Sequence, residues 1–240
     1  MKKLFWIISV MFLLQACTTV QSVYFERLQP ADVNFPAQIR SVGVVNNMPP
    51  VHQDYKDVDY TSASLEGDGD IAAENLAQEL AAVDYFDQVV LYDKRVRKSA
   101  YPLEQPIPKE TVDELIRLLD VDMLLSMERV NVVLKDSTMF IPELYTFVPA
   151  AEGVVTSVVR AYLKQQEKPL FSIQKTDTLC WEIVQDLTFG DIVKDFSEYA
   201  ASIPMQYLLP YWKEEERRYF DGGNVNMRDA GVCVREQNWE

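Results

Sequence analysis

Residue types that carry out nucleophilic or metal-assisted chemistry are scarce in this sequence. The 240 residues include one histidine, His52, and three cysteines, Cys17, Cys180 and Cys233. A catalytic triad or a Cys-His pair would have to use His52, which lies in a polar segment. The histidine and the cysteines are too widely spaced to form a recognisable zinc site. We therefore expect no catalytic residue, no bound metal and no cofactor.

Carboxylates are abundant, and six of them make residues 52–70 acidic: Asp54, Asp57, Asp59, Glu66, Asp68 and Asp70. Alternating acids suit calcium, but the spacing of an EF-hand loop is absent, so we expect a solvated loop. The run Gly67-Asp68-Gly69-Asp70 lacks the lysine of a phosphate loop, and its acids would repel phosphate. A carboxylate pair for glycan hydrolysis remains an alternative, although no pair stands out among the 37 acidic residues. We expect a protein that is not an enzyme.

Cys17 has a different chemical context. Two lysines and a short apolar run from Leu4 to Leu14 precede it, which is typical of a secretory signal and too short for a membrane span. The motif Leu14-Gln15-Ala16-Cys17 resembles the lipobox of bacterial lipoproteins, in which the cysteine is acylated and becomes the new N-terminus. We predict a signal peptide over residues 1–16 and lipidation of Cys17, with an ordinary signal peptide as the alternative.

Charge and length narrow the possible partners. A formal net charge of −14 disfavours binding to nucleic acid or to a bare anionic membrane, so the membrane link must come from the lipid. Residues 18–22, Thr-Thr-Val-Gln-Ser, lack an acidic run associated with surface export. We expect a chain held by its lipid at the periplasmic face of the outer membrane. Cys180 and Cys233 could pair in that compartment, although Cys180 has an apolar setting that suits a buried free thiol.

The elements that must position any site alternate between strands and helices. Residues 17–38 read as a lipidated tether that runs into extended structure, and residues 40–47 as a buried strand. Apolar spacing predicts helices over residues 70–83, with Asp70 as the N-cap, and over residues 109–119. A short strand at residues 88–92 separates them.

The second half of the chain reads as a meander of strands and a closing helix. Strands are predicted at residues 122–134, 154–164 and 170–184, the last two as an antiparallel hairpin. A helix from Asp191 should carry a row of aromatic residues and the charged run 213–218, with bends at Pro204 and Pro210. This order predicts an α/β (α+β) domain over residues 39–221, a mixed β-sheet with packed helices, and a short helical extension over residues 222–240.

Local sequences within this order resemble a known lipoprotein domain. Arg40–Asn46, Ala81–Val90 and Leu119–Leu125 are similar to elements of the α/β domain found in the curli secretion channel and in lipoprotein activators of penicillin-binding proteins. The segments 28–33, 44–47 and 212–220 resemble an uncharacterised lipoprotein family typical of Bacteroidetes, whose members have no assigned activity. Residues 235–240 resemble the start of a tetratricopeptide-like repeat, which would be incomplete here.

Aromatic residues are the best candidates for contacts with a partner, because they dominate binding hot spots. Residues 137–149 are apolar, follow no clean period and contain two prolines. This stretch either packs as core over the sheet edge, which we favour, or remains exposed as a docking surface; its prolines argue against a pore. The candidate contacts are Phe140, Tyr145, Phe147, Tyr207, Tyr211 and Trp212. For Phe147 and Trp212, core packing is the favoured interpretation.

These observations predict a membrane-anchored periplasmic lipoprotein that acts as a non-enzymatic protein-binding or envelope-assembly module. Its expected partners are the membrane, through the lipid on Cys17, and an unknown envelope protein, with no nucleic acid. Two alternatives remain open. One is an envelope glycan hydrolase that uses a carboxylate pair, and the other is a subunit of an oligomeric ring.

Overall fold

A computed structural model describes residues 20–50, 63–97, 105–183, 188–220, 225–236 and 238. Cys17, the predicted signal peptide and His52 lie outside these residues. The chain divides into two compact units, one formed by residues 31–209 and the other by residues 1–30 together with 210–240. No helix of the described residues is both long and apolar enough to cross a membrane.

The larger unit is built on a six-stranded mixed sheet. Its strands are β2 (Ser41–Asn46), β3 (Ser64–Glu66), β4 (Gln88–Leu91), β5 (Met123–Ile141), β6 (Thr146–Leu163) and β7 (Phe171–Glu182). They lie in the order β4-β2-β5-β6-β7, and β3 pairs with β5. The strands β4, β2 and β5 are parallel, whereas β6, β7 and β3 are antiparallel to their neighbours.

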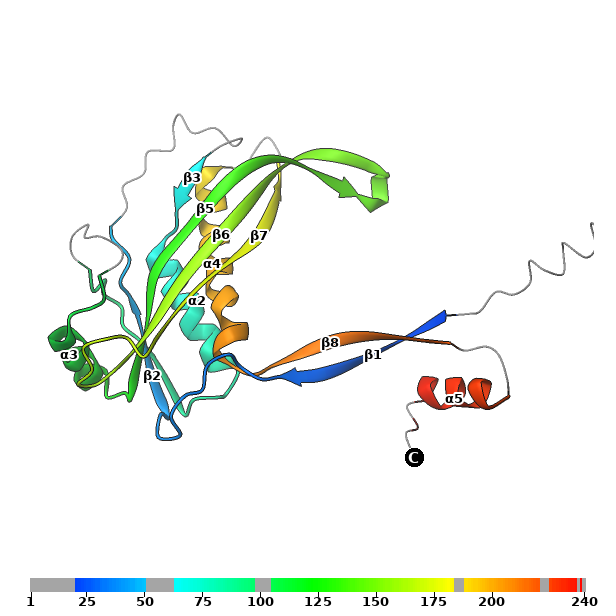
Figure 1. Cartoon of the computed structure of the whole chain (residues 1–240). Coiled ribbons are helices and arrows are strands. Elements are labelled where there is room, and N and C mark those ends of the chain that lie inside the picture. The colour runs from blue at the N-terminus through cyan, green and yellow to red at the C-terminus, as the bar shows by residue number, and fades with distance from the viewer. Residues whose placement is uncertain are drawn as a thin grey trace, which may run out of the picture. The chain divides into compact units, whose positions relative to one another are not determined.

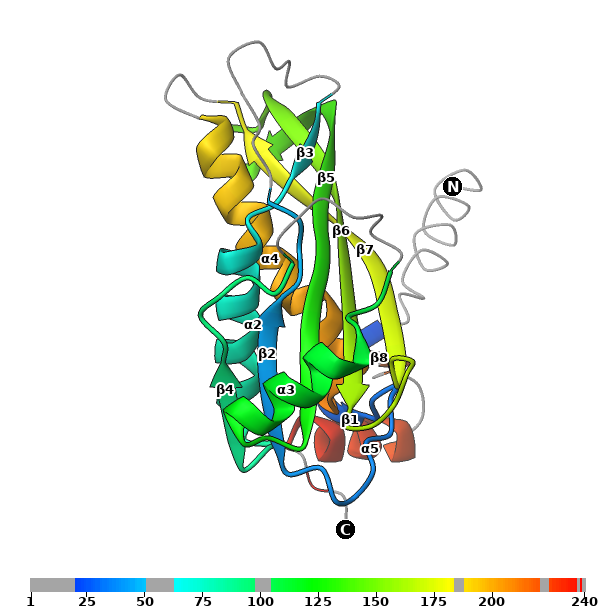
Figure 2. The same ribbon diagram turned by 90° about the vertical axis from the view of Figure 1, so that its left-hand side faces the viewer.

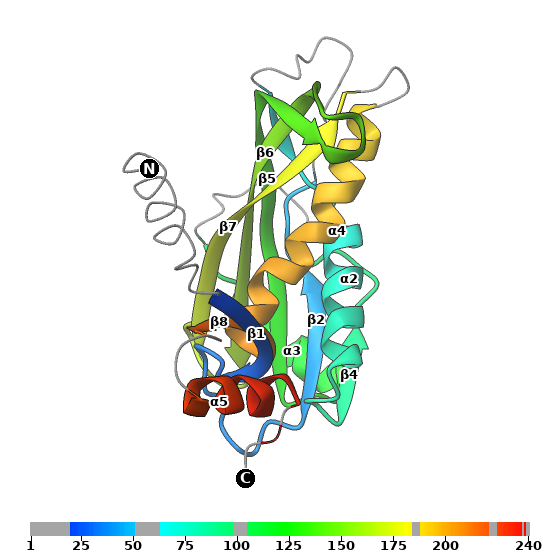
Figure 3. The ribbon, with the colours of Figure 1, turned by 90° about the vertical axis from the view of Figure 1, so that its right-hand side faces the viewer.

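Helices cover the two faces of this sheet unequally. Figure 3 shows α2 (Gly69–Ala82) and α4 (Phe189–Leu208) on one face, and Figure 2 shows α3 (Lys109–Leu119) on the other. The main core lies under α2 and α4, where Leu76, Leu80, Ile192 and Phe196 are fully buried. A smaller core lies under α3, because the apolar stripe of that helix packs on Leu124 and Tyr162.

The predicted fold class, a mixed sheet with packed helices and a C-terminal helix, is confirmed. The 109–119 helix matches its predicted bounds, since its apolar residues recur every three or four positions. The N-cap of α2 is Asp68 rather than Asp70: the Asp68 side chain accepts hydrogen bonds from the main-chain amides of Asp70 and Ile71. Pro204 lies within α4, and the helix ends before Pro210.

The smaller unit pairs segments from the two ends of the chain. Strand β1 (Val20–Gln29) runs antiparallel to β8 (Tyr211–Phe220), and the helix α5 (Val225–Arg235) follows (Figure 1). The prediction that the charged run 213–218 continues a helix is therefore wrong. Its side chains alternate between the two faces of a narrow ribbon, and a partner strand about 190 residues away in sequence supplies the hydrogen bonds that a helix would make internally.

Candidate functional site

Strands β5 and β6 continue beyond the rest of the sheet as a two-stranded arm. Strand β6 pairs with β7 only from Ala150 onward, whereas its pairing with β5 extends to the pair Ile141 and Thr146. A 3-10 turn at Pro142–Leu144 joins the two strands, and Figure 1 shows the arm projecting from the sheet. We refer to residues 137–149 as the arm tip.

The arm tip exposes its aromatic side chains. Tyr145 is 89% exposed and Phe147 is 67% exposed, and Phe140 and Leu144 also face solvent. The rings of Phe140 and Phe147 form a cross-strand pair with centroids 5.1 Å apart. The favoured interpretation of this stretch as core, and of Phe147 in particular, is wrong. Among the described residues, no helix or third strand covers the arm beyond Ala150.

The other three predicted contact residues lie outside the arm tip. Tyr207 lies on α4, where the Lys175 ammonium sits 3.8 Å from the centre of its ring. Tyr211 and Trp212 lie on β8 and, as consecutive strand residues, point to opposite faces. Trp212 is 66% exposed, so its interpretation as a core residue is also wrong. Within the larger unit, Phe140, Tyr145 and Phe147 form a common surface at the arm tip.

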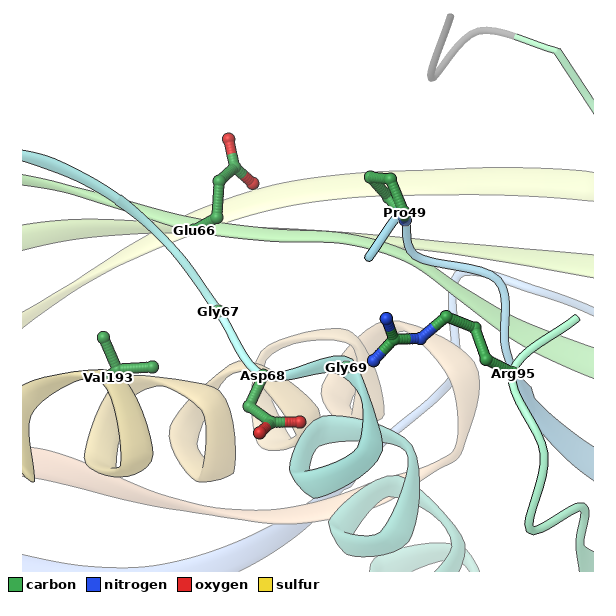
Figure 4. Close-up of a pocket in the computed structure, with 7 residues that line it drawn as sticks. All are labelled: Pro49, Glu66, Gly67, Asp68, Gly69, Arg95 and Val193. Carbon is green, nitrogen blue, oxygen red and sulfur yellow. The ribbon is translucent and has the colours of Figure 1, made fainter. Parts of the chain in front are cut away.

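A polar cleft lies where α/β proteins commonly bind ligands. The chain leaves β2 for β4 on one side and returns to β5 on the other, so the carboxyl end of β2 marks a topological switch point. The cleft there has a volume of about 110 Å³. Figure 4 shows the residues that line it: Pro49, Glu66, Gly67, Asp68, Gly69, Arg95 and Val193.

Internal contacts engage several polar groups in and around this cleft, although Arg95 Nε is buried without a hydrogen-bond partner among the described residues. The Asn46 amide donates to Asp70 at 2.6 Å, and Arg95 forms an ion pair with the same carboxylate at 3.3 Å. Asp68 uses its carboxylate to cap α2, so the first amides of the helix are not available to an anion. Burial raises the pKa of the Glu66 carboxyl, and the nearby Arg129 charge opposes part of this increase. The cleft therefore joins β2, α2 and the segment after β4, and its carboxylates disfavour phosphate binding.

A buried ionic network lies on the α3 side of the sheet. Glu128 sits where the β5–β6 register shifts, which is the position of a β-bulge, and it is 1% exposed. Its carboxylate accepts hydrogen bonds from the Asn47 amide at 2.7 Å and the Tyr162 hydroxyl at 3.0 Å. Arg97 and Arg160 approach it at 3.6 and 3.7 Å. Burial raises the pKa of Glu128, whereas the Asn47 hydrogen bond and the Arg160 charge lower it.

This network fixes the segment that leads into α3. The Arg97 guanidinium donates to the carbonyls of Asn47 at 2.9 Å and Gln105 at 3.2 Å, and the amide of Ile107 donates to the Tyr162 hydroxyl. This network was not identified from the sequence, because its members come from four separate segments of the chain and no local pattern connects them. Its hydrogen bonds and ion pairs tie the segments before α3 to the sheet.

Carboxylates also gather in an open groove of about 540 Å³ between α2, α4 and β7. Glu79, Asp195 and Glu198 line it, and burial raises the pKa of Glu79. Asp195 accepts a hydrogen bond from the Trp181 indole at 3.1 Å, and Glu198 lies 3.9 Å from Lys194. The groove is the one place among the described cavities that combines several carboxylates with an aromatic wall.

The described part of the chain contains no assembled metal site and no paired thiols. No group of three His, Cys, Asp or Glu side chains there is placed to hold a metal ion. Cys180 and Cys233 are both exposed free thiols, so Cys180 is not the buried thiol that its apolar neighbours suggested.

Comparison with known proteins shows the family of the chain. The comparison with curated proteins finds no match. The PelC dodecamer of Paraburkholderia phytofirmans is similar in two crystal forms, with 14% identity, TM-scores of 0.31 and 0.32, and coverage of 78% of this chain and 99% of that chain. A minor lipoprotein from Acinetobacter baumannii is similar at 8% identity and a TM-score of 0.30, over 73% of this chain and 98% of that chain. The model of a domain of unknown function, DUF8603, matches residues 39–220, so the chain belongs to the DUF8603 family.

Proposed function

We propose that this protein is a lipoprotein, anchored through Cys17 at the periplasmic face of the outer membrane, that binds other envelope proteins as a non-enzymatic assembly module. The arm tip is the contact surface, with Phe140, Tyr145 and Phe147 as its anchoring side chains. The exposure of these three rings on one projecting hairpin is the observation that carries the proposal.

Energetics favour a partner for the arm tip. Apolar side chains exposed together at one place mark interaction sites more often than scattered ones do. Aromatic rings bury a large area and lose little conformational entropy on binding, which makes them effective anchors. The arm tip carries one charged residue, Glu143, so little polar desolvation would oppose its docking.

The anchor rests on the sequence around Cys17. A basic start, a short apolar core and the Leu14-Gln15-Ala16-Cys17 motif support cleavage before Cys17 and its acylation. Several acyl chains on one cysteine would hold a protein firmly at a membrane, without help from surface charge. This matters because the chain is strongly acidic.

The proposal is tested by co-purification from envelope membranes solubilised in detergent. The full acylated chain is compared with the variant Phe140→Ala/Tyr145→Ala/Phe147→Ala. We expect the parent to retain an envelope protein that the variant loses. A matched control, Leu118→Ala/Val133→Ala, removes exposed apolar side chains elsewhere and should retain the partner.

Retention of the same protein by the arm variant would contradict the proposal, provided that circular dichroism shows an unchanged fold. A mass measurement in detergent shows whether the retained protein is another envelope component or a second copy of this chain. The second result would favour the oligomeric ring instead.

The carboxylate groove favours one second candidate, a hydrolase of envelope glycans. Glu79, whose pKa is raised by burial, would be the general acid, and Asp195 or Glu198 the second carboxylate. This candidate predicts that the chain releases reducing ends from purified envelope glycan and that Glu79→Gln abolishes the release. The exposed Glu110→Gln serves as the matched control. Absence of release by the parent chain would exclude this reaction on the glycan tested.

A further inference from the structure

The β1–β8 ribbon brings the end of β8 close to the segment that follows Cys17, the residue proposed to carry the lipid. In the antiparallel register, Val20 pairs with Phe220 at one end of the ribbon, and Leu28 pairs with Trp212 at the other. Figure 1 shows the start of β1 and the end of β8 side by side. The end that contains Val20 and Phe220 is called the anchor end below.

Chain length limits how far the anchor end can lie from the acylated cysteine. Cys17 precedes Val20 by three residues, and three extended residues span at most about 11 Å. An acylated Cys17 has its lipid in the bilayer and its backbone at the bilayer surface. Val20 must then lie within that distance of the headgroups, and Phe220, which is paired with it, within about 5 Å more.

The residues at the anchor end suit a bilayer surface. Val20 and Phe220 are 52% and 55% exposed, and Tyr219 pairs with Gln21 next to them. Tyrosine and other aromatic rings favour the membrane–water interface, where an apolar body and a polar edge are both satisfied.

Most of the charges of β8 are ordered along the same axis. Arg217 and Arg218 adjoin the anchor end, where they pair with Glu215 and Glu216, each at 3.3 Å. Glu214 and Lys213 lie farther along the ribbon. Arginines near a membrane attract lipid phosphates, and carboxylates are repelled by them. The acidic part of the ribbon therefore lies on the side away from the lipid.

We propose that the anchor end, formed by Val20, Arg217, Arg218, Tyr219 and Phe220, is a second membrane contact that meets the lipid headgroups end-on. This inference rests on the lipid anchor of the proposed function. It places the start of β1 and the end of β8 together at the bilayer surface.

Tryptophan fluorescence in vesicles with brominated acyl chains tests this arrangement. The acylated mature chain is placed in vesicles of phosphatidylcholine and phosphatidylglycerol. In one variant, Trp181→Phe and Trp239→Phe leave only Trp212; in the other, Trp212→Phe and Phe220→Trp are added. Trp212 and residue 220 are eight residues apart on one strand, or about 27 Å, so the first variant is an internal control for the second. If Trp181→Phe unfolds the chain, Trp181 is kept in both variants and its contribution cancels.

We expect brominated lipid to quench Phe220→Trp several-fold more strongly than Trp212, because interfacial aromatic rings sit at the headgroup level next to the acyl chains, whereas Trp212 lies about 27 Å farther along the strand. Equal quenching of both sites would overturn the end-on contact, since the ribbon would then lie flat. Absence of quenching at both sites would also overturn the end-on contact, because the anchor end would then be covered by protein and not by lipid. Vesicle flotation of the same samples separates the two proposals: a chain that floats without quenching refutes only this inference, and a chain that does not float refutes the lipid anchor as well.

Discussion

Glu128 shows how one side chain can hold several elements together. Its carboxylate lies at a bulge in β5 and accepts hydrogen bonds from Asn47, directly after β2, and from Tyr162 on β6, while Arg97 and Arg160 lie 3.6 and 3.7 Å from it. A buried ion group of this kind adds little stability compared with an apolar core, but removal of the Glu128 carboxylate leaves both arginines without the counter-charge that they face.

We therefore expect Glu128→Gln to lower the free energy of unfolding by about 3 kcal/mol, because two arginines keep their burial and lose the carboxylate charge. Urea denaturation followed by circular dichroism measures this change. The same substitution at the exposed Glu110 on α3 should leave the midpoint nearly unchanged. Equal effects at both positions would show that the buried network does not act as a unit.

Asp122 gives a prediction with a defined pH direction. Its carboxylate accepts hydrogen bonds from the amides of Arg40 and Ser41, each at 2.9 Å, and these bonds lower its pKa below 3.8. When the pKa of a carboxyl is lower in the folded state than in the unfolded state, its ionisation stabilises the fold. This stabilisation is complete at pH values above the unfolded-state pKa and is lost as the pH falls through the folded-state pKa. Because Asn cannot titrate, the stability advantage of the parent over Asp122→Asn should shrink as the pH falls below about 4.

Urea midpoints measured at several pH values check this prediction, with Asp93→Asn as a control at an exposed position. A difference between the parent and Asp122→Asn that stays constant at acidic pH would contradict the role assigned to the two amide hydrogen bonds.

At the scale of elements, the entry to α2 depends on a glycine. A Cβ atom at Gly67 would lie 2.5 Å from Val130 Cγ1 and 2.8 Å from Val130 Cβ, which is too close for any side chain. We expect Gly67→Ala to lower the free energy of unfolding by about 2 kcal/mol through overpacking. A Cβ at Gly190, in the first turn of α4, meets nothing nearer than 3.5 Å. There, Gly190→Ala should raise the free energy of unfolding by about 0.5 kcal/mol, since alanine favours a helix.

Thermal denaturation compares Gly67→Ala with Gly190→Ala, and a similar loss of stability in both variants would contradict this account of Gly67.

The arm tip should contribute little to folding. Its three aromatic side chains are exposed, and exposed side chains away from special features usually change stability by less than about 0.5 kcal/mol. The triple variant Phe140→Ala/Tyr145→Ala/Phe147→Ala should therefore unfold at nearly the same urea concentration as the parent. A large loss of stability would mean that the rings pack against the fold and do not await a partner.

The elements could be predicted where one face is buried. The helix at 109–119 has a continuous apolar stripe, and β6 alternates buried and half-buried residues between Ala151 and Ser157, so both leave a clear period in the sequence. The arm tip and β8 leave none, because neither strand packs a whole face on the core. The charged run of β8 reads as a solvated helix, and only its pairing with β1, from the other end of the chain, makes it a strand.

At the scale of the whole molecule, the sequence predicts which residue types can form a site better than it predicts where those residues lie in the fold. The aromatic residues of the arm tip could be identified in the sequence, but their exposure could not be predicted, because apolar residues occur both in protein cores and on protein surfaces. The ionic network of Glu128 and the carboxylate groove join elements that are far apart in sequence, so no local spacing could reveal them.

These features describe a molecule with separate regions for separate tasks. The larger unit supplies a rigid sheet locked by the Glu128 network, and the arm extends from that sheet with its aromatic residues exposed. The smaller unit joins the two ends of the chain in a ribbon that begins three residues after Cys17. In the proposed function, the ribbon meets the membrane and the arm meets a protein.

Photo-crosslinking from the arm tip in living cells tests the central claim most directly. A benzoyl-phenylalanine introduced at Tyr145 is compared with one at Leu118, which is exposed on α3. The account predicts one discrete protein adduct from position 145, none from position 118, and loss of the adduct when Phe140→Ala and Phe147→Ala are added. Adducts with lipid alone, or the same adducts from both positions, would contradict the assignment of the arm tip as a protein-binding surface.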